Sequence, residues 1–510
     1  MKRKQHRRCL SIAVFGTLLA FTEVASCEDV RPKTVALMTP DERQVMVAQM
    51  QVTLDEALSG KQLIEDYPWP IVATVNLSDA DNVIVVDLDR RILDYTSLSE
   101  SEDMGDYIFN RLWPFLERID GSTGVRFLYG GHEEEYWSGK PGIDAMPRTT
   151  SGRKKRNADD RPLVVVAPGH GVYFHRKFKD WRAQREPVNG VLEDDMTTVL
   201  SGHLESALLR DGLRVDKLRP GAPTGVHDAS EQPWWRLAVR YQLERRFPDL
   251  KGVWQSLPTK PVTADKKGLE ERDEDIRSRP LYANHVGADA LIHIHTNAES
   301  PEVNGLRAYV TDRAEDRVLA SRILCSAEEL LRTNPKFDSF KVAPSPHEHT
   351  KKAENNSATM PSVIVEVGFH TNPQDAQFLQ DRAFQTLSMR GVAKGYRLYR
   401  NKRPCEEFVI NPGEEVVGRV GIDVQMPFSF KGNPVYPIRV WSRDKKCTYR
   451  GCHNVDKTLS GPSDLEKFKL KYLCKREDLE RPPIEVTVGA KDFDGVRAAP
   501  ATLKVVCKAG

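Results

Sequence analysis

The sequence predicts an α/β fold at the centre of the chain, with a mainly parallel, twisted sheet flanked by helices. Between residues 161 and 400, short apolar runs alternate with longer stretches of helical periodicity, which is the pattern of a parallel sheet. Three of these runs end at or beside His170, His295 and Glu366. Because sites in open α/β sheets lie outside the carboxyl ends of the strands, the pattern predicts a site at one sheet edge.

Length and charge limit the remaining possibilities. A chain of 510 residues exceeds a single hydrophobic core, so several domains are expected. The formal net charge is only +2, and 29% of the residues are charged. No strongly basic surface of the kind that binds nucleic acid is therefore expected.

Residues 1–26 are predicted to be an export signal. Five Lys and Arg residues between positions 2 and 8 precede an apolar run over 10–21, which is too short to span a bilayer. The segment ends in Val24-Ala25-Ser26-Cys27, which suits either ordinary cleavage or attachment of a lipid to Cys27. We expect a protein of the periplasm or cell envelope whose only membrane contact is that lipid.

Residues 27–138 are predicted to form an N-terminal α+β accessory module. Strand patterns over 70–77, 82–88 and 124–129 accompany a helical pattern over 104–119. Residues 139–160 are rich in Pro, Gly, Ser and charge and include the basic run 153–156, so we expect an exposed linker.

The central domain, residues 161–400, is expected to alternate strands and helices throughout. The predicted strands cover residues 163–167, 213–217, 290–295, 306–311 and 362–367. The predicted helices cover 193–210, a segment ending near 285, 314–332 and 373–400. An insertion over 220–275 is expected to add a helix, either as a lid or, as we favour, as a surface elaboration.

Residues 401–510 are predicted to form a β-sandwich that contains disulfides. Short alternating segments separated by turn signals are typical of that architecture. Five cysteines lie in this region, which indicates an oxidising compartment and leaves one cysteine free or paired elsewhere. Cys325 falls in a helical pattern and is expected to be a buried core residue.

Three side chains at the predicted sheet edge match the ligands of a catalytic zinc ion, which takes three His or carboxylate groups and leaves one position open. His170 lies in a Gly-His-Gly turn, Glu193 begins a predicted helix, and His295 ends a predicted strand. Asp194 and Asp195 leave the identity of the carboxylate ligand open. Glu366 places a carboxylate at the end of an apolar strand, where it is costly unless paired, metal-bound or catalytic.

Five motifs follow one another in this region. They are Ala167-Pro168-Gly169-His170-Gly171, Gly190-Val191-Leu192-Glu193, Arg279-Pro280-Leu281-Tyr282-Ala283-Asn284, His295-Thr296-Asn297-Ala298 and Glu366-Val367-Gly368-Phe369-His370-Thr371-Asn372. Their order resembles the zinc-dependent N-acetylmuramoyl-L-alanine amidases of bacteria, the amidase type-three family. The resemblance implies one zinc ion on His170, Glu193 and His295, with Glu366 as the catalytic carboxylate. It also implies peptidoglycan as the substrate, cut between N-acetylmuramic acid and L-Ala of the stem peptide.

Two positions depart from the family pattern. The family usually has Asp where this chain has Ala167, and Ser where it has His293. His293 and His295 point to the same side of a strand, so His293 is a partner of a ligand, a substrate contact or a competing ligand. Arg279, Asn297 and Asn372 are further candidates for contact with substrate or with the ligands.

Two other functions remain open. A catalytically silent protein that binds peptidoglycan or acts as a scaffold would have lost Glu366 or a ligand, and all four residues are present. A zinc peptidase would need an Arg that holds a substrate carboxylate, for which Arg279 is the only candidate in a motif. Besides peptidoglycan, regulatory envelope proteins are expected partners, through the N- or C-terminal module. The C-terminal domain is expected either to bind the wall or a partner protein or to act as a spacer.

Overall fold

The structure is a computed structural model that describes residues 32–121, 124–138, 160–222, 224–258, 265–444 and 446–510. The predicted export signal, Cys27 and all but one residue of the predicted linker lie outside the described residues. Among the residues that are described, no helix has both the length and the apolar character needed to cross a membrane.

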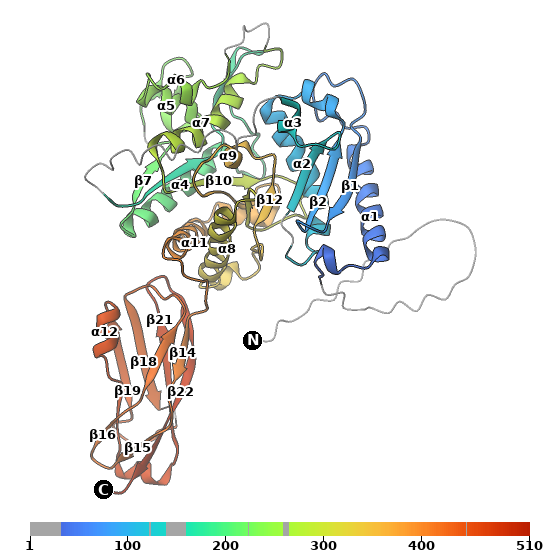
Figure 1. Ribbon diagram of the computed structural model, residues 1–510. Coiled ribbons are helices and arrows are strands. Elements are labelled where there is room, and N and C mark those ends of the chain that lie inside the picture. The colour runs from blue at the N-terminus through green and yellow to red at the C-terminus, as the bar shows by residue number, and fades with distance from the viewer. Residues whose placement is uncertain (1–31, 122–123, 139–159, 223, 259–264, 445) are drawn as a thin grey trace.

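Within the described residues, nine strands form one sheet in the order β1-β2-β3-β12-β11-β13-β10-β4-β7 (Figure 1). Six of its eight pairings are parallel, and only β1–β2 and β11–β13 are antiparallel. The predicted fold class, a mainly parallel sheet flanked by helices, is confirmed. The strands are β1 (Ala73–Ser78), β2 (Val83–Leu88), β3 (Gly124–Tyr129), β4 (Leu163–Pro168), β7 (Arg214–Lys217), β10 (Ala290–Asn297), β11 (Arg307–Val310), β12 (His347–His349) and β13 (Ser362–Phe369).

The N-terminal strands continue the central sheet, whereas the sequence suggested an accessory module of its own. Strand β3 pairs in parallel with β12, and Gly124 lies opposite Glu348. Gly124 has φ +128°, and a side chain there would overlap the backbone of Glu348, so only glycine fits this junction. The N-terminal core also includes Tyr309 and Ile364 from the central strands.

Helices cover both faces of the sheet. One face packs against α4 (Glu193–Arg210), α8 (Ala314–Leu331) and α11 (Arg382–Arg400), around an apolar core. The other face carries α1 (Pro40–Leu58) and α2 (Leu98–Leu116) over the N-terminal strands, and α5 (Val239–Arg246) and α7 (Glu270–Val286) over the rest. The predicted helix over 373–400 is divided into α10 (Pro373–Leu379) and α11 because the Asp381 side chain caps the start of α11.

The insertion over 220–275 forms part of the core. It contains the short elements β8 (Val226–His227), β9 (Gln232–Pro233), α5 and α6 (Lys251–Trp254). Leu237, Val239 and Leu243 are fully buried. The favoured interpretation of a surface elaboration was wrong for this part of the insertion, because its apolar residues pack against α7 and the sheet.

The C-terminal region is β-rich, as predicted, and projects from the sheet domain beyond α8 and α11 (Figure 1). Its main sheet has the order β17-β14-β22-β21-β18-β19, with β15 beside β22, and β16 and β20 form a separate pair. These strands are β14 (Val409–Pro412), β15 (Val416–Arg419), β16 (Asp423–Gln425), β17 (Phe428–Lys431), β18 (Ile438–Asp444), β19 (Asn454–Leu459), β20 (Lys471–Leu473), β21 (Ile484–Lys491) and β22 (Arg497–Lys508).

Three disulfides tie this part of the chain together. Two lie within the C-terminal domain, Cys447–Cys452 and Cys474–Cys507. The third joins Cys325 of α8 to Cys405, at the start of that domain. The prediction of Cys325 as a buried core residue was therefore wrong: it is exposed and is the partner of the fifth C-terminal cysteine.

Candidate metal centre

Three ligand atoms converge at the carboxyl edge of the sheet. His170 Nε2 lies 3.3 Å from Glu193 Oε1, and His295 Nδ1 lies 3.5 Å from the same oxygen. The two imidazole nitrogens are 3.2 Å apart. A tetrahedral zinc ion with bonds of about 2.0–2.1 Å separates its ligand atoms by about 3.3–3.4 Å, so this group has dimensions that fit one metal ion of this kind.

Local structure explains this convergence. His170 follows β4 with φ +58°, in a turn that aims its ring back over the sheet edge. A side chain at Gly169 would come within 2.4 Å of the His295 ring, so glycine is required for the two histidines to approach. Glu193 is the first residue of α4, and its Oε1 also accepts a hydrogen bond of 2.9 Å from the Thr296 amide beside His295.

The far nitrogen of each histidine faces an oxygen acceptor. His170 Nδ1 lies 3.1 Å from Gln184 Oε1, and His295 Nε2 lies 3.1 Å from Glu354 Oε2. An acceptor on the far nitrogen keeps the proton there and leaves the near nitrogen free to bind a metal. Both histidines are thus oriented as metal ligands.

A chain of buried polar contacts connects these two acceptors. Gln184 Nε2 donates to Asp275 Oδ2 over 3.0 Å, and Arg279 donates to both Asp275 and Glu354. Arg279 is fully buried. Arg279 thus lies enclosed between Asp275 and Glu354, behind the residues that face the two histidines.

Charge in the group also suits a cation. Burial lowers the pKa of His295 to about 3, so its ring is neutral at physiological pH. Burial alone would raise the pKa of Glu193, but the adjacent histidines lower it well below its ordinary value, so the carboxylate is ionised. A neutral imidazole and an ionised carboxylate are protonation states that metal binding requires.

Glu366 lies beside this group on the neighbouring strand. It pairs in register with His295, and the two side chains emerge on the same side of the sheet. Only 4% of Glu366 is exposed, and its Oε2 has no hydrogen-bond partner among the described residues. Burial raises its pKa to about 8, Lys352 opposes this rise, and the charge of Glu193 adds to it. This carboxylate can therefore take up and release a proton near neutral pH.

His293 lies outside the group of three. It is fully buried, and its Nδ1 is 3.6 Å from Glu354 Oε2 rather than directed at Glu193. His293 stands opposite Ala167 in the pairing of β10 with β4. The two departures from the family pattern are thus neighbours, and the small Ala167 side chain leaves room for the larger His293.

Replacement of His293 by Ser is expected to leave zinc stoichiometry at one ion per chain, because no ligand atom is lost. Elemental analysis of the purified variant checks this. Loss of the ion would show that His293, and not His295, is the ligand.

The other acidic residues at the start of α4 have different partners. Asp194 is fully buried and accepts hydrogen bonds from the amides of Gly171, Gln184 and Arg185. Asp195 pairs with Arg236. Glu193 is therefore the carboxylate that faces the two histidines.

The two remaining predicted residues have local roles. Asn372 caps α10 by accepting from the amides of Gln374 and Asp375, and it donates to Pro301 O. Asn297 donates to the hydroxyl of Tyr309 and accepts from the amide of Ala298. Asn372 thus caps a helix and is buried, whereas Asn297 lies two residues beyond His295 and is partly exposed.

Four residues around the centre were not predicted: Gln184, Asp275, Lys352 and Glu354. Gln184 follows the small hairpin of β5 (Tyr173–His175) and β6 (Asp180–Arg182), and Glu354 lies in the four-residue helix α9 (Ala353–Asn356). Neither segment has a periodic pattern. Polar residues in irregular segments, and single carboxylates on a highly charged helix such as α7, which carries Asp275, usually face solvent. The sequence therefore contained no indication of these roles.

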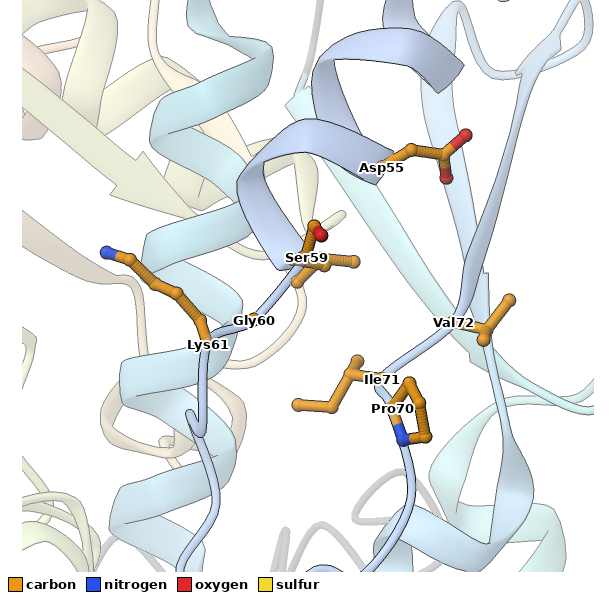
Figure 2. Close-up of a pocket in the computed structure, with 8 residues that line it drawn as sticks. Asp55, Ser59, Gly60, Lys61, Pro70, Ile71 and Val72 are labelled. Atoms are coloured by element: carbon orange, nitrogen blue, oxygen red, sulfur yellow. The ribbon is translucent and has the colours of Figure 1, made fainter.

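A hollow of about 390 Å³ lies apart from these residues, between the end of α1 and the segment that leads into β1 (Figure 2). It is lined by Asp55, Leu58, Ser59, Gly60, Lys61, Pro70, Ile71 and Val72. None of the predicted site residues belongs to its walls, so the hollow is not part of the metal centre.

Comparison with known proteins gives a family for the central domain. Residues 164–397 match the sequence model of the family described as N-acetylmuramoyl-L-alanine amidase. No curated protein sequence matches the chain.

Solved structures similar to this chain include three amidases. The amidase AmiC2 of Nostoc punctiforme is 20% identical, over 47% of this chain and 97% of that one, with a TM-score of 0.31. An amidase from Clostridium difficile 630 is 15% identical, over 48% and 100%, with a TM-score of 0.33. Ami1 from Mycobacterium smegmatis is 14% identical, over 48% and 98%, with a TM-score of 0.31.

The family match covers the strands, helices and turns that carry His170, Glu193, His295 and Glu366. Residues 164–397 of this chain form a domain of the N-acetylmuramoyl-L-alanine amidase family.

Proposed function

We propose that the protein is an exported peptidoglycan hydrolase that cleaves the amide between N-acetylmuramic acid and L-Ala of the stem peptide. The observation that carries the proposal is the buried group of His170, Glu193 and His295 beside Glu366, within the segment that matches the amidase family. This is the complete set of groups needed for metal-assisted hydrolysis of an amide.

The reaction follows from these parts. Zinc, when bound by His170, Glu193 and His295, supplies a Lewis acid that lowers the pKa of water towards ~7 and polarises the scissile carbonyl. Glu366 accepts the proton of the attacking water and passes it to the nitrogen of L-Ala as the carbon–nitrogen bond breaks. The raised pKa of Glu366, about 8, suits a group that must both hold and give up a proton.

The structure weighs against the two alternative functions. Oε2 of Glu366 is buried without a hydrogen-bond partner among the described residues, which lowers the stability of the fold. A catalytic role accounts for such an oxygen, whereas a silent binding protein would gain nothing from it. A peptidase would need a free cation for a substrate carboxylate, and Arg279, the candidate in the motif, is enclosed by Asp275 and Glu354. Amide hydrolysis in peptidoglycan remains the best supported function.

The proposed location is the periplasm or cell envelope of a bacterium, with or without a lipid on Cys27. Three disulfides favour an oxidising compartment. Peptidoglycan lies outside the cytoplasmic membrane, which agrees with the predicted export signal. Regulatory envelope proteins would reach the enzyme through the N-terminal segment or the projecting C-terminal domain.

Purified protein is expected to release stem peptides from isolated sacculi, and mass analysis of the products should show free L-Ala amino termini. A chelator is expected to abolish release by removing the ion, and added zinc to restore it. Products cut within the stem peptide, or an unchanged rate after metal removal, would contradict the proposal.

A further inference from the structure

We propose that the N-terminal segment helps to set the geometry of the metal centre. Helix α2 holds residues 347–354, here called the strap, and the strap positions Glu354 against the ligand His295. The inference rests on metal binding at the proposed site and is independent of which amide is cut. It makes Glu354 a positioning residue and gives the residues before the predicted linker a role in metal binding.

Glu354 is well placed to orient His295. Only 3% of the residue is exposed, and its two oxygens have different partners. Oε2 lies 3.1 Å from His295 Nε2, while Oε1 accepts from Arg279. A carboxylate behind a ligand histidine fixes both the rotation and the tautomer of the ring. The geometry of the metal centre therefore depends on where Glu354 is held.

The strap cannot hold Glu354 by its own structure. It consists of β12, a turn, and the first residues of α9, a helix of four residues. A helix of one turn gains too few hydrogen bonds to form by itself in water. External contacts must fix the position of Glu354.

Helix α2 supplies those contacts through two carboxylates. Glu102 Oε1 accepts a hydrogen bond of 2.7 Å from the amide of Ala353, the residue directly before Glu354. Asp106 Oδ2 accepts from Lys352 Nζ over 2.7 Å, and its Oδ1 lies 3.1 Å from His349 Nε2. Positions 102 and 106 are four apart on one helix, so both carboxylates face the strap.

The sheet reinforces the same connection. Strand β12 is paired with β3, so the start of the strap is hydrogen-bonded to the N-terminal strands. The hydroxyl of Thr350 also accepts from the amide of Phe127 in β3, over 3.3 Å. A continuous path thus runs from α2 and β3 through the strap to Glu354 and His295.

The first test shortens the positioning residue. Glu354→Asp retains a negative charge for Arg279 but withdraws the carboxylate from His295. In the metal-stripped, full-length protein, we expect zinc affinity to fall about 10- to 100-fold, measured by competition with a chelator. The visible spectrum of the cobalt(II) form should change as well, since the orientation of a ligand changes.

The matched control is Glu329→Asp. Glu329 is a largely enclosed glutamate of α8 that pairs with Lys394 of α11 and belongs neither to the strap nor to the metal ligands. We expect its zinc affinity to equal that of the wild type. Equal zinc affinities and cobalt spectra for both variants and the wild type would overturn the role of Glu354.

The second test alters α2 at a distance from the metal. Glu102→Ala leaves the Ala353 amide without its acceptor, and zinc affinity is expected to fall about 10-fold. Glu100→Gln is the control, since Gln preserves the capping of α2 and removes only the ion pair with Lys267. If Glu102→Ala does not fold, Asp106→Asn decides the same question.

Wild-type zinc affinity in Glu102→Ala, or in Asp106→Asn where that variant is used instead, would overturn the role of the N-terminal segment. A wild-type protein that binds no zinc at all would instead refute the proposed function, so the two failures are distinguishable.

Discussion

Replacement of Glu366 by Gln is expected to reduce the release of stem peptides from sacculi about 10²- to 10⁴-fold, with zinc still bound at one ion per chain. The side chain of Gln has the same size but cannot accept the proton of the attacking water. None of the three ligand atoms is changed. The rate of peptide release and elemental analysis of zinc together check the result.

The Gln variant is also expected to fold at least as well as the wild type. Burial raises the pKa of Glu366 to about 8 from its ordinary value of 4.5. A carboxyl whose pKa is raised by folding lowers the stability of the metal-free protein as pH rises from about 4.5 to 8. A neutral amide avoids that cost, so the melting temperature of the metal-free variant at pH 8 should not fall.

Two controls test whether the loss of activity in Glu366→Gln comes from the loss of a general base. Glu329→Gln changes a largely enclosed glutamate of α8, which pairs with Lys394 outside the strap and the metal centre, and should keep its activity. In the wild type, kcat/KM should fall at acidic pH, with an apparent pKa above 4.5, as Glu366 takes up a proton. The residual rate of the Gln variant should not show that fall. Near-normal hydrolysis by Glu366→Gln would remove Glu366 from the mechanism.

The central strands could be predicted because the signals that mark them lie within short, contiguous segments of the sequence. The apolar residues of β4, β10 and β13 are contiguous, and the polar residues that end these strands stand out against them. Parallel strands bring their carboxyl ends to one edge, so the sequence pattern alone is enough to place His170, His295 and Glu366 together.

The continuation of the sheet into the N-terminal strands could not be predicted. It depends on β12, which has only three residues, His347-Glu348-His349. No apolar alternation marks such a strand, because its polar side chains are buried by contacts with distant residues such as Asp106 and Arg317. The parallel pairing of β12 with β3 is likewise a contact between segments far apart in the chain.

The partners of the ligands were hidden for the same reason. Glu354 is 59 residues from His295, and Asp275 is 91 residues from Gln184. A family resemblance identifies the ligands because they have fixed motifs. The groups behind the ligands differ here, where Gln184 supports His170 and the family's usual Asp is Ala167. Only the folded chain shows which residues take over that support.

Replacement of Arg279 by Met is expected to lower the free energy of unfolding by about 3–5 kcal/mol. Arg279 is fully buried and donates to Asp275 and Glu354, which are also buried. Without the guanidinium, two carboxylates remain inside the protein with no compensating charge. Urea unfolding of the metal-free protein measures the loss, and zinc affinity should fall with it because Glu354 is no longer held.

The exposed pair of Arg182 and Asp180 offers the control, since Arg182→Met should change the unfolding free energy by less than about 1 kcal/mol. A stronger check replaces the whole group. Arg279→Met combined with Asp275→Asn and Glu354→Gln removes all three charges, so part of the lost stability should return, because the cost arises from unpaired buried charge. If the triple variant is no more stable than Arg279→Met alone, packing of the long Arg279 side chain, and not charge neutralisation, holds this part of the centre together.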